Sequence, residues 1–180
     1  MNSTKEDQLK VPGASLYYET RGSGPVLLLI PGGPTDATIF AGLAPRVSDS
    51  YTVVTYDPRG LSRSKLDVLP EDRRIVEIFA DDAHRLLTAV GSEPAFVFGN
   101  SGGALVGLAL VTRYPQQVRT LVAHEPPAAT LLPDGSAALV AMQEVYDTYR
   151  STGIGPAMQK FLVAAGIPDP WGQNPRTASS

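Results

Sequence analysis

Several absences narrow what this 180-residue chain can be. It contains no cysteine, which excludes disulfide bonds and thiolate metal sites. Its uninterrupted apolar runs, such as residues 26–30 and 137–142, are far too short to cross a bilayer. The polar segment 1–10 lacks the apolar core of a secretory signal, and a net charge of −3 gives no reason to expect a nucleic-acid partner. We therefore expect a soluble, cytoplasmic protein without a membrane or nucleic-acid partner.

The length and the apolar pattern predict an α/β fold. A hydrophobic fraction of 43% and a length of 180 residues suit one domain with a real core. Strand and helix patterns alternate, which predicts a mostly parallel sheet with helices on both faces. The expected strands are 16–20, 26–30, 51–56, 95–98 and 118–123, and the expected helices are 37–43, 75–90 and 102–113.

The alternation stops after Glu125, where two prolines interrupt the chain. Ser136 can cap one helix, and Pro156 suits the first turn of another. Two consecutive helices do not extend a sheet, so we expect an insertion above it. The predicted organisation is a core over residues 1–125, a helical segment over 126–167 and a disordered tail over 168–180.

The most informative motif is Gly-Asn-Ser-Gly-Gly at residues 99–103, between an apolar strand and a helix. This order of strand, Gly-x-Ser-x-Gly and helix predicts a nucleophile elbow, a sharp turn that exposes the hydroxyl of Ser101 above the end of the sheet. Small residues at 102–104 would let the strand and the helix approach closely. A phosphate-binding loop is the alternative, but the spacing matches neither Gly-x-Gly-x-x-Gly nor the lysine-bearing P-loop.

A second glycine motif, Pro-Gly-Gly-Pro at residues 31–34, follows the most apolar strand. Glycines here allow a backbone N–H to face a cavity at the carboxyl end of the sheet, as an oxyanion hole requires. Pro34 has no N–H to donate, which favours Gly33. We predict that the N–H groups of Gly33 and Gly102 form the oxyanion hole.

These two motifs, together with Asp-Pro-Arg-Gly-Leu-Ser-Arg-Ser at residues 57–64, resemble the α/β-hydrolase fold superfamily in order and spacing. The similarity is greatest to its small esterases, lactonases and peptidase-like members with a helical cap. Pro31 stands where such families usually carry a histidine. The resemblance implies hydrolysis of an ester or related acyl bond through an acyl-enzyme on Ser101, without metal or organic cofactor. The 57–64 loop is expected to brace neighbouring loops, with Asp57 and Arg59 in structural roles.

The resemblance also implies groups that this sequence lacks. In such families an Asp or Glu and then a late His follow the cap. Separately, a serine nucleophile argues against the dehalogenase and epoxide hydrolase branches of the superfamily, because those branches use an aspartate. The chain has only two histidines, so we expect a partial chain without the catalytic His. His84 lies on a helix that runs away from the site and is expected at the surface. His124 ends the strand next to that of Ser101, at the active end of the sheet, and Glu125 follows it. The two could act as a substitute base and acid, or form a hydrogen-bonded junction to the cap.

The sequence leaves two functional classes open. The first is a serine hydrolase of a small-molecule substrate with an apolar acyl or alcohol part. The second is an inactive hydrolase-like module that binds a small apolar ligand, which the missing base favours and the intact serine and glycines oppose.

Overall fold

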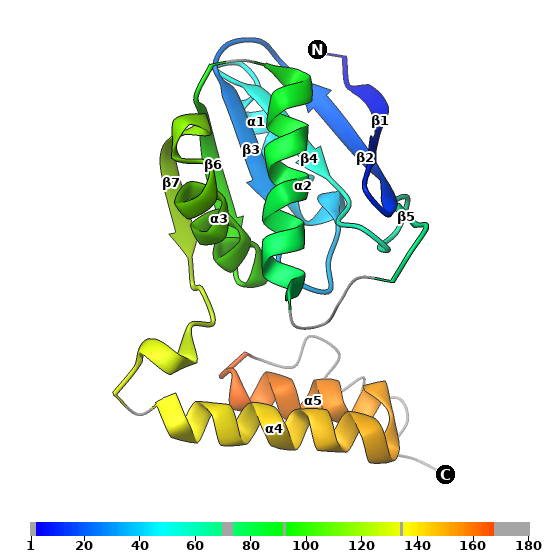
Figure 1. Cartoon of the computed structure of the whole chain (residues 1–180), viewed down its shortest axis with the longest axis vertical. Helices are drawn as coiled ribbons and strands as arrows, with labels where there is room; N and C mark the ends of the chain where they lie inside the picture. The colour runs from blue at the N-terminus through cyan, green and yellow to red at the C-terminus, as the bar shows by residue number, and fades with distance from the viewer. Residues whose placement is uncertain (1–2, 70–73, 92, 134, 168–180) are drawn as a thin grey trace, which may run out of the picture. The chain divides into compact units, whose positions relative to one another are not determined.

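The computed structural model describes residues 3–69, 74–91, 93–133 and 135–167 (Figure 1). The chain forms two compact units, which divide between Pro127 and Ala128. This division lies two residues beyond the end of the expected core at Glu125. The expected disordered tail, 168–180, lies outside the described residues.

The first unit is built on a seven-stranded sheet, counted over the described residues. The strands run in the order β1-β2-β4-β3-β6-β7, and β5 pairs with β2 outside this path. Strands β3, β4, β6 and β7 are mutually parallel, whereas β2 is antiparallel to its neighbours β1, β4 and β5. The strands are β1 (Lys5–Val11), β2 (Ala14–Arg21), β3 (Val26–Ile30), β4 (Thr52–Tyr56), β5 (Lys65–Leu66), β6 (Ala95–Asn100) and β7 (Val118–His124).

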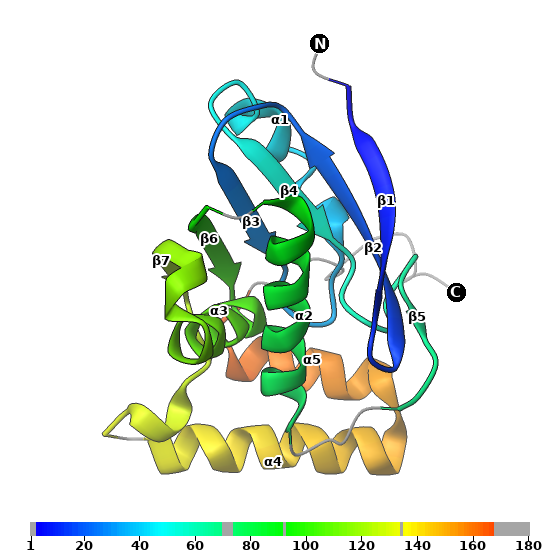
Figure 2. The same ribbon diagram turned by 45° about the horizontal axis from the view of Figure 1, so that its top comes forward.

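Helices cover both faces of this sheet, as expected. Figures 1 and 2 show α2 (Ile75–Val90) and α3 (Gly102–Arg113) side by side on one face. The short helix α1 (Ala44–Val47) and the 3-10 turn η1 (Ala37–Phe40) pack in a separate cluster. Alternate residues of β3 point to opposite faces of the sheet. Leu28 is buried in the cluster formed with α2 and α3, and Leu29 is buried in the cluster that contains Phe40. A strand covered on both faces is uniformly apolar, which explains the solid apolar run in the sequence.

The strand β1, and with it the hairpin at the edge of the sheet, was not predicted, whereas β2 contains the strand expected over residues 16–20. β1 is exposed along most of its length, so its sequence, KEDQLKV, carries little of the apolar signal that marks a buried strand. The predicted helix over 37–43 is also shorter than expected. It consists of the single 3-10 turn of η1, whose N-cap Asp36 accepts a hydrogen bond from the Thr38 N–H at 2.9 Å.

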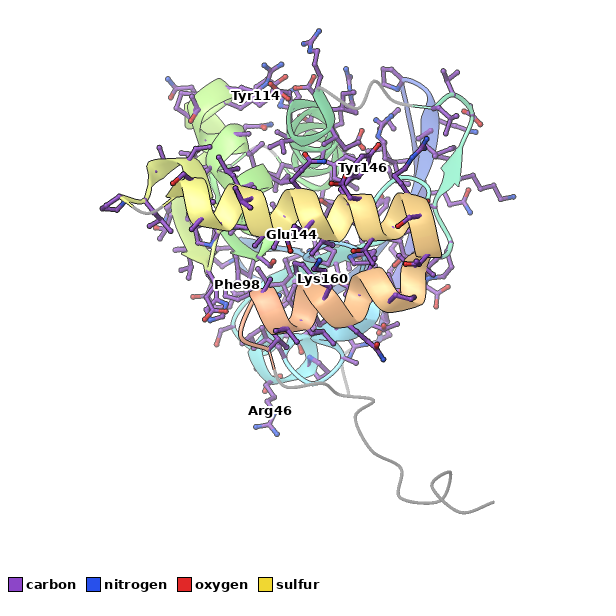
Figure 3. The ribbon with its side chains drawn as sticks, turned by 90° about the horizontal axis from the view of Figure 1, so that it is seen from below. Arg46, Phe98, Tyr114, Glu144, Tyr146 and Lys160 are labelled. Atoms are coloured by element: carbon purple, nitrogen blue, oxygen red, sulfur yellow. The ribbon has the colours of Figure 1, made fainter. Side chains whose placement is uncertain are left out.

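The second unit is a helical hairpin of α4 (Gly135–Thr152) and α5 (Ile154–Ala164), preceded by the 3-10 turn η4 (Ala129–Leu131). Gly153, at φ 94°, makes the turn between the helices. Glu144 of α4 and Lys160 of α5 form an ion pair at 3.0 Å (Figure 3). Ser136 is the second residue of α4 and therefore does not cap it. Over the described residues, no helix combines the length and apolar character that a bilayer span requires.

Candidate active site

Ser101 occupies the turn between β6 and α3. Its backbone is at φ 52° and ψ −119°, a conformation that side-chain-bearing residues rarely adopt. Such strained residues cluster at functional sites, where the surrounding structure holds them in place. Here the Ser101 N–H donates a 2.9 Å hydrogen bond to the carbonyl oxygen of His124. The serine is therefore held by the end of the adjacent strand β7.

The backbone segments around Ser101 approach one another so closely that glycine is required at several positions. A Cβ on Gly99 would lie 2.7 Å from the carbonyl carbon of Gly103, on the far side of the turn. A Cβ on Gly103 would lie 2.5 Å from the carbonyl oxygen of Pro31, at the end of the neighbouring strand. Real Cβ atoms do not come so close to backbone atoms, so β6, α3 and the 31–34 loop meet only because glycine occupies these positions.

The 31–34 loop lies directly against the elbow. A Cβ on Gly32 would lie 3.1 Å from the Cβ of Ser101, and one on Gly102 would lie 3.4 Å from the Gly33 nitrogen. The Thr35 N–H donates to the Gly32 carbonyl at 3.0 Å and closes the turn. Within the described part of the chain, neither the Gly33 nor the Gly102 N–H donates a hydrogen bond to another residue. The structure thus brings together Ser101 and the two predicted donors.

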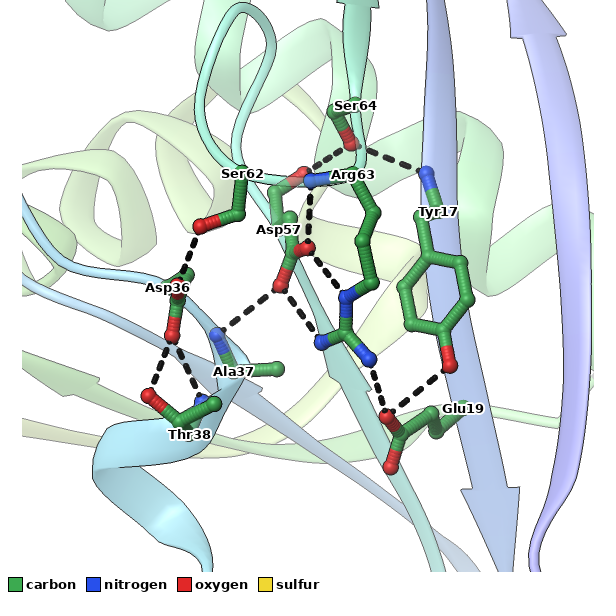
Figure 4. Close-up of polar contacts among 9 residues, drawn as sticks. All are labelled: Tyr17, Glu19, Asp36, Ala37, Thr38, Asp57, Ser62, Arg63 and Ser64. Carbon is green, nitrogen blue, oxygen red and sulfur yellow. Dashed lines mark hydrogen bonds and ion pairs between the residues drawn. The ribbon is translucent and has the colours of Figure 1, made fainter.

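The loop after β4 is braced by Asp57, which is fully buried (Figure 4). One carboxylate oxygen accepts from the Ala37 N–H at 3.1 Å, and the other from the Arg63 N–H at 3.0 Å. The Arg63 guanidinium also donates to this carboxylate, at 2.8 and 3.0 Å, and its carbon lies 3.7 Å above the centre of the Tyr17 ring. Asp57 therefore joins η1, the 57–64 loop and β2, which confirms the structural role expected for it.

Arg59 forms a second, buried brace with Asp82 of α2. The two side chains are 6% and 2% exposed, and Arg59 Nε donates to Asp82 at 2.7 Å. Burial raises the pKa of Asp82, and the paired guanidinium opposes this shift. Arg59 also donates to the Pro12 carbonyl at 3.2 Å, which ties the loop to the β1–β2 hairpin.

Neither histidine reaches the serine hydroxyl. His84 stacks on Tyr114 with ring centres 3.8 Å apart, and its Nδ1 lies 2.7 Å from Gln117 Oε1, so it is half-buried between helices and not simply at the surface. His124 is exposed, and its Nδ1 lies 3.0 Å from Asn100 Oδ1. Among the described residues, no side chain hydrogen-bonds Ser101 Oγ.

Glu125, which was considered as a substitute acid or as part of a hydrogen-bonded junction to the cap, follows β7 in the left-handed region, at φ 49°, and is exposed. Asn100, which was not predicted as a site residue, is the residue of β6 that pairs with His124 of β7. Its position directly before Ser101 in the Gly-Asn-Ser-Gly-Gly motif is the sequence feature that could have indicated a place in the site. No three acidic or histidine side chains of the described residues lie close enough to share a metal ion.

A cavity of about 160 Å³ lies beside the two free N–H groups. Gly33 and Gly102 form part of its lining, and the rest comes mainly from apolar side chains of β4, α2 and α3. The sequence does not predict this cavity, because its walls come from segments that lie far apart in the chain. The side chains that line it include Tyr56, Val76, Phe79, Leu105 and Val106.

Comparisons with known proteins agree on the fold. A model of the alpha/beta hydrolase fold family matches residues 25–159. The uncharacterized hydrolase YraK of Bacillus subtilis (strain 168) is 51% identical over 124 residues, which are 69% of this chain and 45% of that protein. A zearalenone hydrolase of Cladophialophora bantiana is 36% identical over 120 residues, 65% of this chain and 45% of that protein. The chain thus spans about half the length of the curated relatives it matches.

Solved structures resemble the chain at low sequence identity. The N-acyl homoserine lactonase AidH, in complex with N-butanoyl homoserine, is 24% identical with a TM-score of 0.66, and the match covers 84% of this chain and 60% of that one. A mutant epoxide hydrolase of Vigna radiata is 21% identical with a TM-score of 0.60, over 66% of this chain and 37% of that one. At this identity the likeness shows a shared fold.

Proposed function

The chain belongs to the α/β-hydrolase fold family, and we propose that it is a serine hydrolase with Ser101 as the nucleophile. Ser101 Oγ attacks the carbonyl carbon of an ester or related acyl bond and forms an acyl-enzyme as the alcohol leaves. Water then attacks the acyl-enzyme and releases the acid. The N–H groups of Gly33 and Gly102 donate hydrogen bonds to the oxygen that becomes negatively charged in both steps.

The observation that carries this proposal is the conformation of Ser101 next to two unused donors. At φ 52° the serine is held above the end of β6, and its own N–H is occupied by the His124 carbonyl. This leaves Gly102, the first residue of α3, to donate toward the reacting carbonyl together with Gly33. The positive end of the α3 dipole adds to the stabilisation of the developing charge.

The proton of Ser101 needs an acceptor for efficient attack. His124 and Glu125 are the candidates near the end of β7, but His124 Nδ1 is already paired with Asn100. Because a serine hydroxyl without a base is a weak nucleophile, we expect this chain alone to be slower than a serine hydrolase with a complete triad by several orders of magnitude.

A binding module is the second candidate function. It is favoured by one observation, the absence of a hydrogen-bond partner for Ser101 Oγ among the described residues. In that case the site would hold a small apolar ligand without cleaving it. The strained serine and the free Gly33 and Gly102 donors favour the hydrolase.

The test is hydrolysis of p-nitrophenyl butyrate by the purified chain and by Ser101→Ala, with circular dichroism to show that both are folded. We expect slow turnover by the wild-type chain and none by the variant. His124→Gln then shows whether this histidine takes the proton. Equal inactivity of two folded proteins would reject the hydrolase and leave the binding module.

A further inference from the structure

The cavity beside the elbow has a size and a lining that select a particular kind of group. It measures about 160 Å³ and lies entirely within the first unit. Phe79 of α2 and Leu105 and Val106 of α3 supply apolar walls, and no charged side chain takes part in the lining. Burying a charge against such walls is costly, so the cavity favours an uncharged, apolar group.

The volume sets the size of that group. An apolar cavity of about 150 Å³ lined by leucine, isoleucine and phenylalanine accommodates benzene. The present cavity therefore suits a compact group of roughly four to six carbon atoms. A longer chain would extend through the open side of the cavity and would gain no further contact with these walls.

The position of the cavity relates this group to the reaction. Gly33 and Gly102 are part of its wall, so a group inside it lies next to the donors that would hold the carbonyl oxygen. The acyl group stays bonded to the serine until water releases it, whereas the alcohol leaves in the first step. Apolar contacts that hold the acyl group therefore act through both steps.

We propose that this cavity is the acyl pocket of the enzyme and holds about four to six carbons of an uncharged acyl group. This inference rests on the proposed role of Ser101 as the nucleophile. It places the apolar part of the substrate in the acyl group, whereas the sequence did not distinguish an apolar acyl group from an apolar alcohol.

Binding without turnover gives the first test. Ser101→Ala, labelled with ¹⁵N and with ¹³C in its methyl groups, is titrated with two isomeric esters, ethyl hexanoate and hexyl acetate, which carry the same chain length on opposite sides. We expect ethyl hexanoate to shift the methyl signals of Leu105 and Val106 together with the amide signals of Gly33 and Gly102. Equal or stronger shifts of both sets by hexyl acetate would overturn the acyl assignment, and no shift with either ester would overturn the pocket.

A filling variant tests whether the cavity holds the acyl group. Val76→Phe adds bulk at a half-buried wall position of α2, and Val111→Phe makes the same change at a half-buried position of α3 outside the lining. We expect Val76→Phe, combined with Ser101→Ala, to abolish the ethyl hexanoate shifts and Val111→Phe to retain them. Leu105→Phe provides a second filling variant if Val76→Phe does not melt cooperatively. Retained binding in a folded filling variant would contradict the proposal.

Kinetics with p-nitrophenyl esters of increasing acyl length separate this inference from the proposed function. We expect kcat/KM to rise about fourfold for each methylene up to the hexanoyl ester and to level off beyond it. A continued rise to the decanoyl ester would overturn the pocket. Inactivity toward every ester would reject the serine hydrolase, and the titrations would then still decide whether the cavity binds short apolar chains.

Discussion

The N–H of Ser101 donates a hydrogen bond to the carbonyl oxygen of His124, with a nitrogen-to-oxygen distance of 2.9 Å. This contact connects the turn after β6 to the end of β7, its parallel neighbour. It has two consequences for the site. The strained backbone of Ser101 depends on β7, and the Ser101 N–H is not free to bind an oxyanion, a role that the proposed function gives to Gly102 and Gly33.

Replacing Gly103 should disrupt the contact between the elbow and β3. An added Cβ would lie 2.5 Å from the Pro31 carbonyl oxygen, so Gly103→Ala should cost about 1–3 kcal/mol of unfolding free energy even though alanine is the better helix former. Urea denaturation measures this cost. Gly42→Ala is the matched control, because its Cβ would meet nothing within 4 Å, and its effect should stay within about 0.5 kcal/mol. Equal effects of the two substitutions would contradict the close approach.

The buried pair of Arg59 and Asp82 should show strong coupling. Asp82→Ala leaves a guanidinium that is only 6% exposed without its partner, so we expect a loss of about 3–5 kcal/mol. The double replacement Arg59→Met with Asp82→Leu removes both charges and should cost less than the single change. Chemical denaturation of the two single variants and the double variant gives the coupling energy. Additive losses would show that the pair contributes no mutual stabilisation.

Asp36 should make stability depend on pH in acid. Hydrogen bonds from Ser62 and then from Thr38 lower the pKa of the Asp36 carboxyl below its usual value of about 3.9. Because the folded-state pKa is the lower one, the contribution is complete above about pH 4 and is lost as the pH falls toward the folded-state pKa. The difference in unfolding free energy between the wild-type chain and Asp36→Asn should therefore shrink on acidification through this range. A difference that stays constant with pH would argue against an ionised, hydrogen-bonded Asp36.

Tyr56 carries a buried hydroxyl without a hydrogen-bond partner among the described residues. Burying an unsatisfied hydroxyl costs about 1–3 kcal/mol, so Tyr56→Phe should leave the unfolding free energy unchanged or raise it. Tyr114→Phe is the contrasting variant, because the Tyr114 hydroxyl donates to Asp81 at 2.8 Å, and it should lose about 1 kcal/mol. Thermal denaturation compares the two. A larger loss for Tyr56→Phe than for Tyr114→Phe would contradict this ranking.

The local elements could be predicted from the sequence because their signals are local. The apolar stripe of residues 75–90 and the solid run of 26–30 gave α2 and β3 with their observed ends. β1 was missed for the opposite reason, since an exposed edge strand needs few apolar residues. The mutual arrangement of Asp57, Arg63 and Tyr17 could not be derived, because their contacts join β2 to a loop more than forty residues later in the chain.

The sequence by itself determined that Ser101 would stand on a sharp turn between a strand and a helix, because glycine spacing and apolar periodicity act over a few residues. The tertiary structure decided what surrounds that turn. The strand order β4-β3-β6-β7 places β3 next to β6, although about 65 residues separate them, and this brings Gly33 beside Gly102 and creates the cavity between β4, α2 and α3. Strand order follows from burying both faces of the whole sheet at once, and no short segment of the chain carries that information.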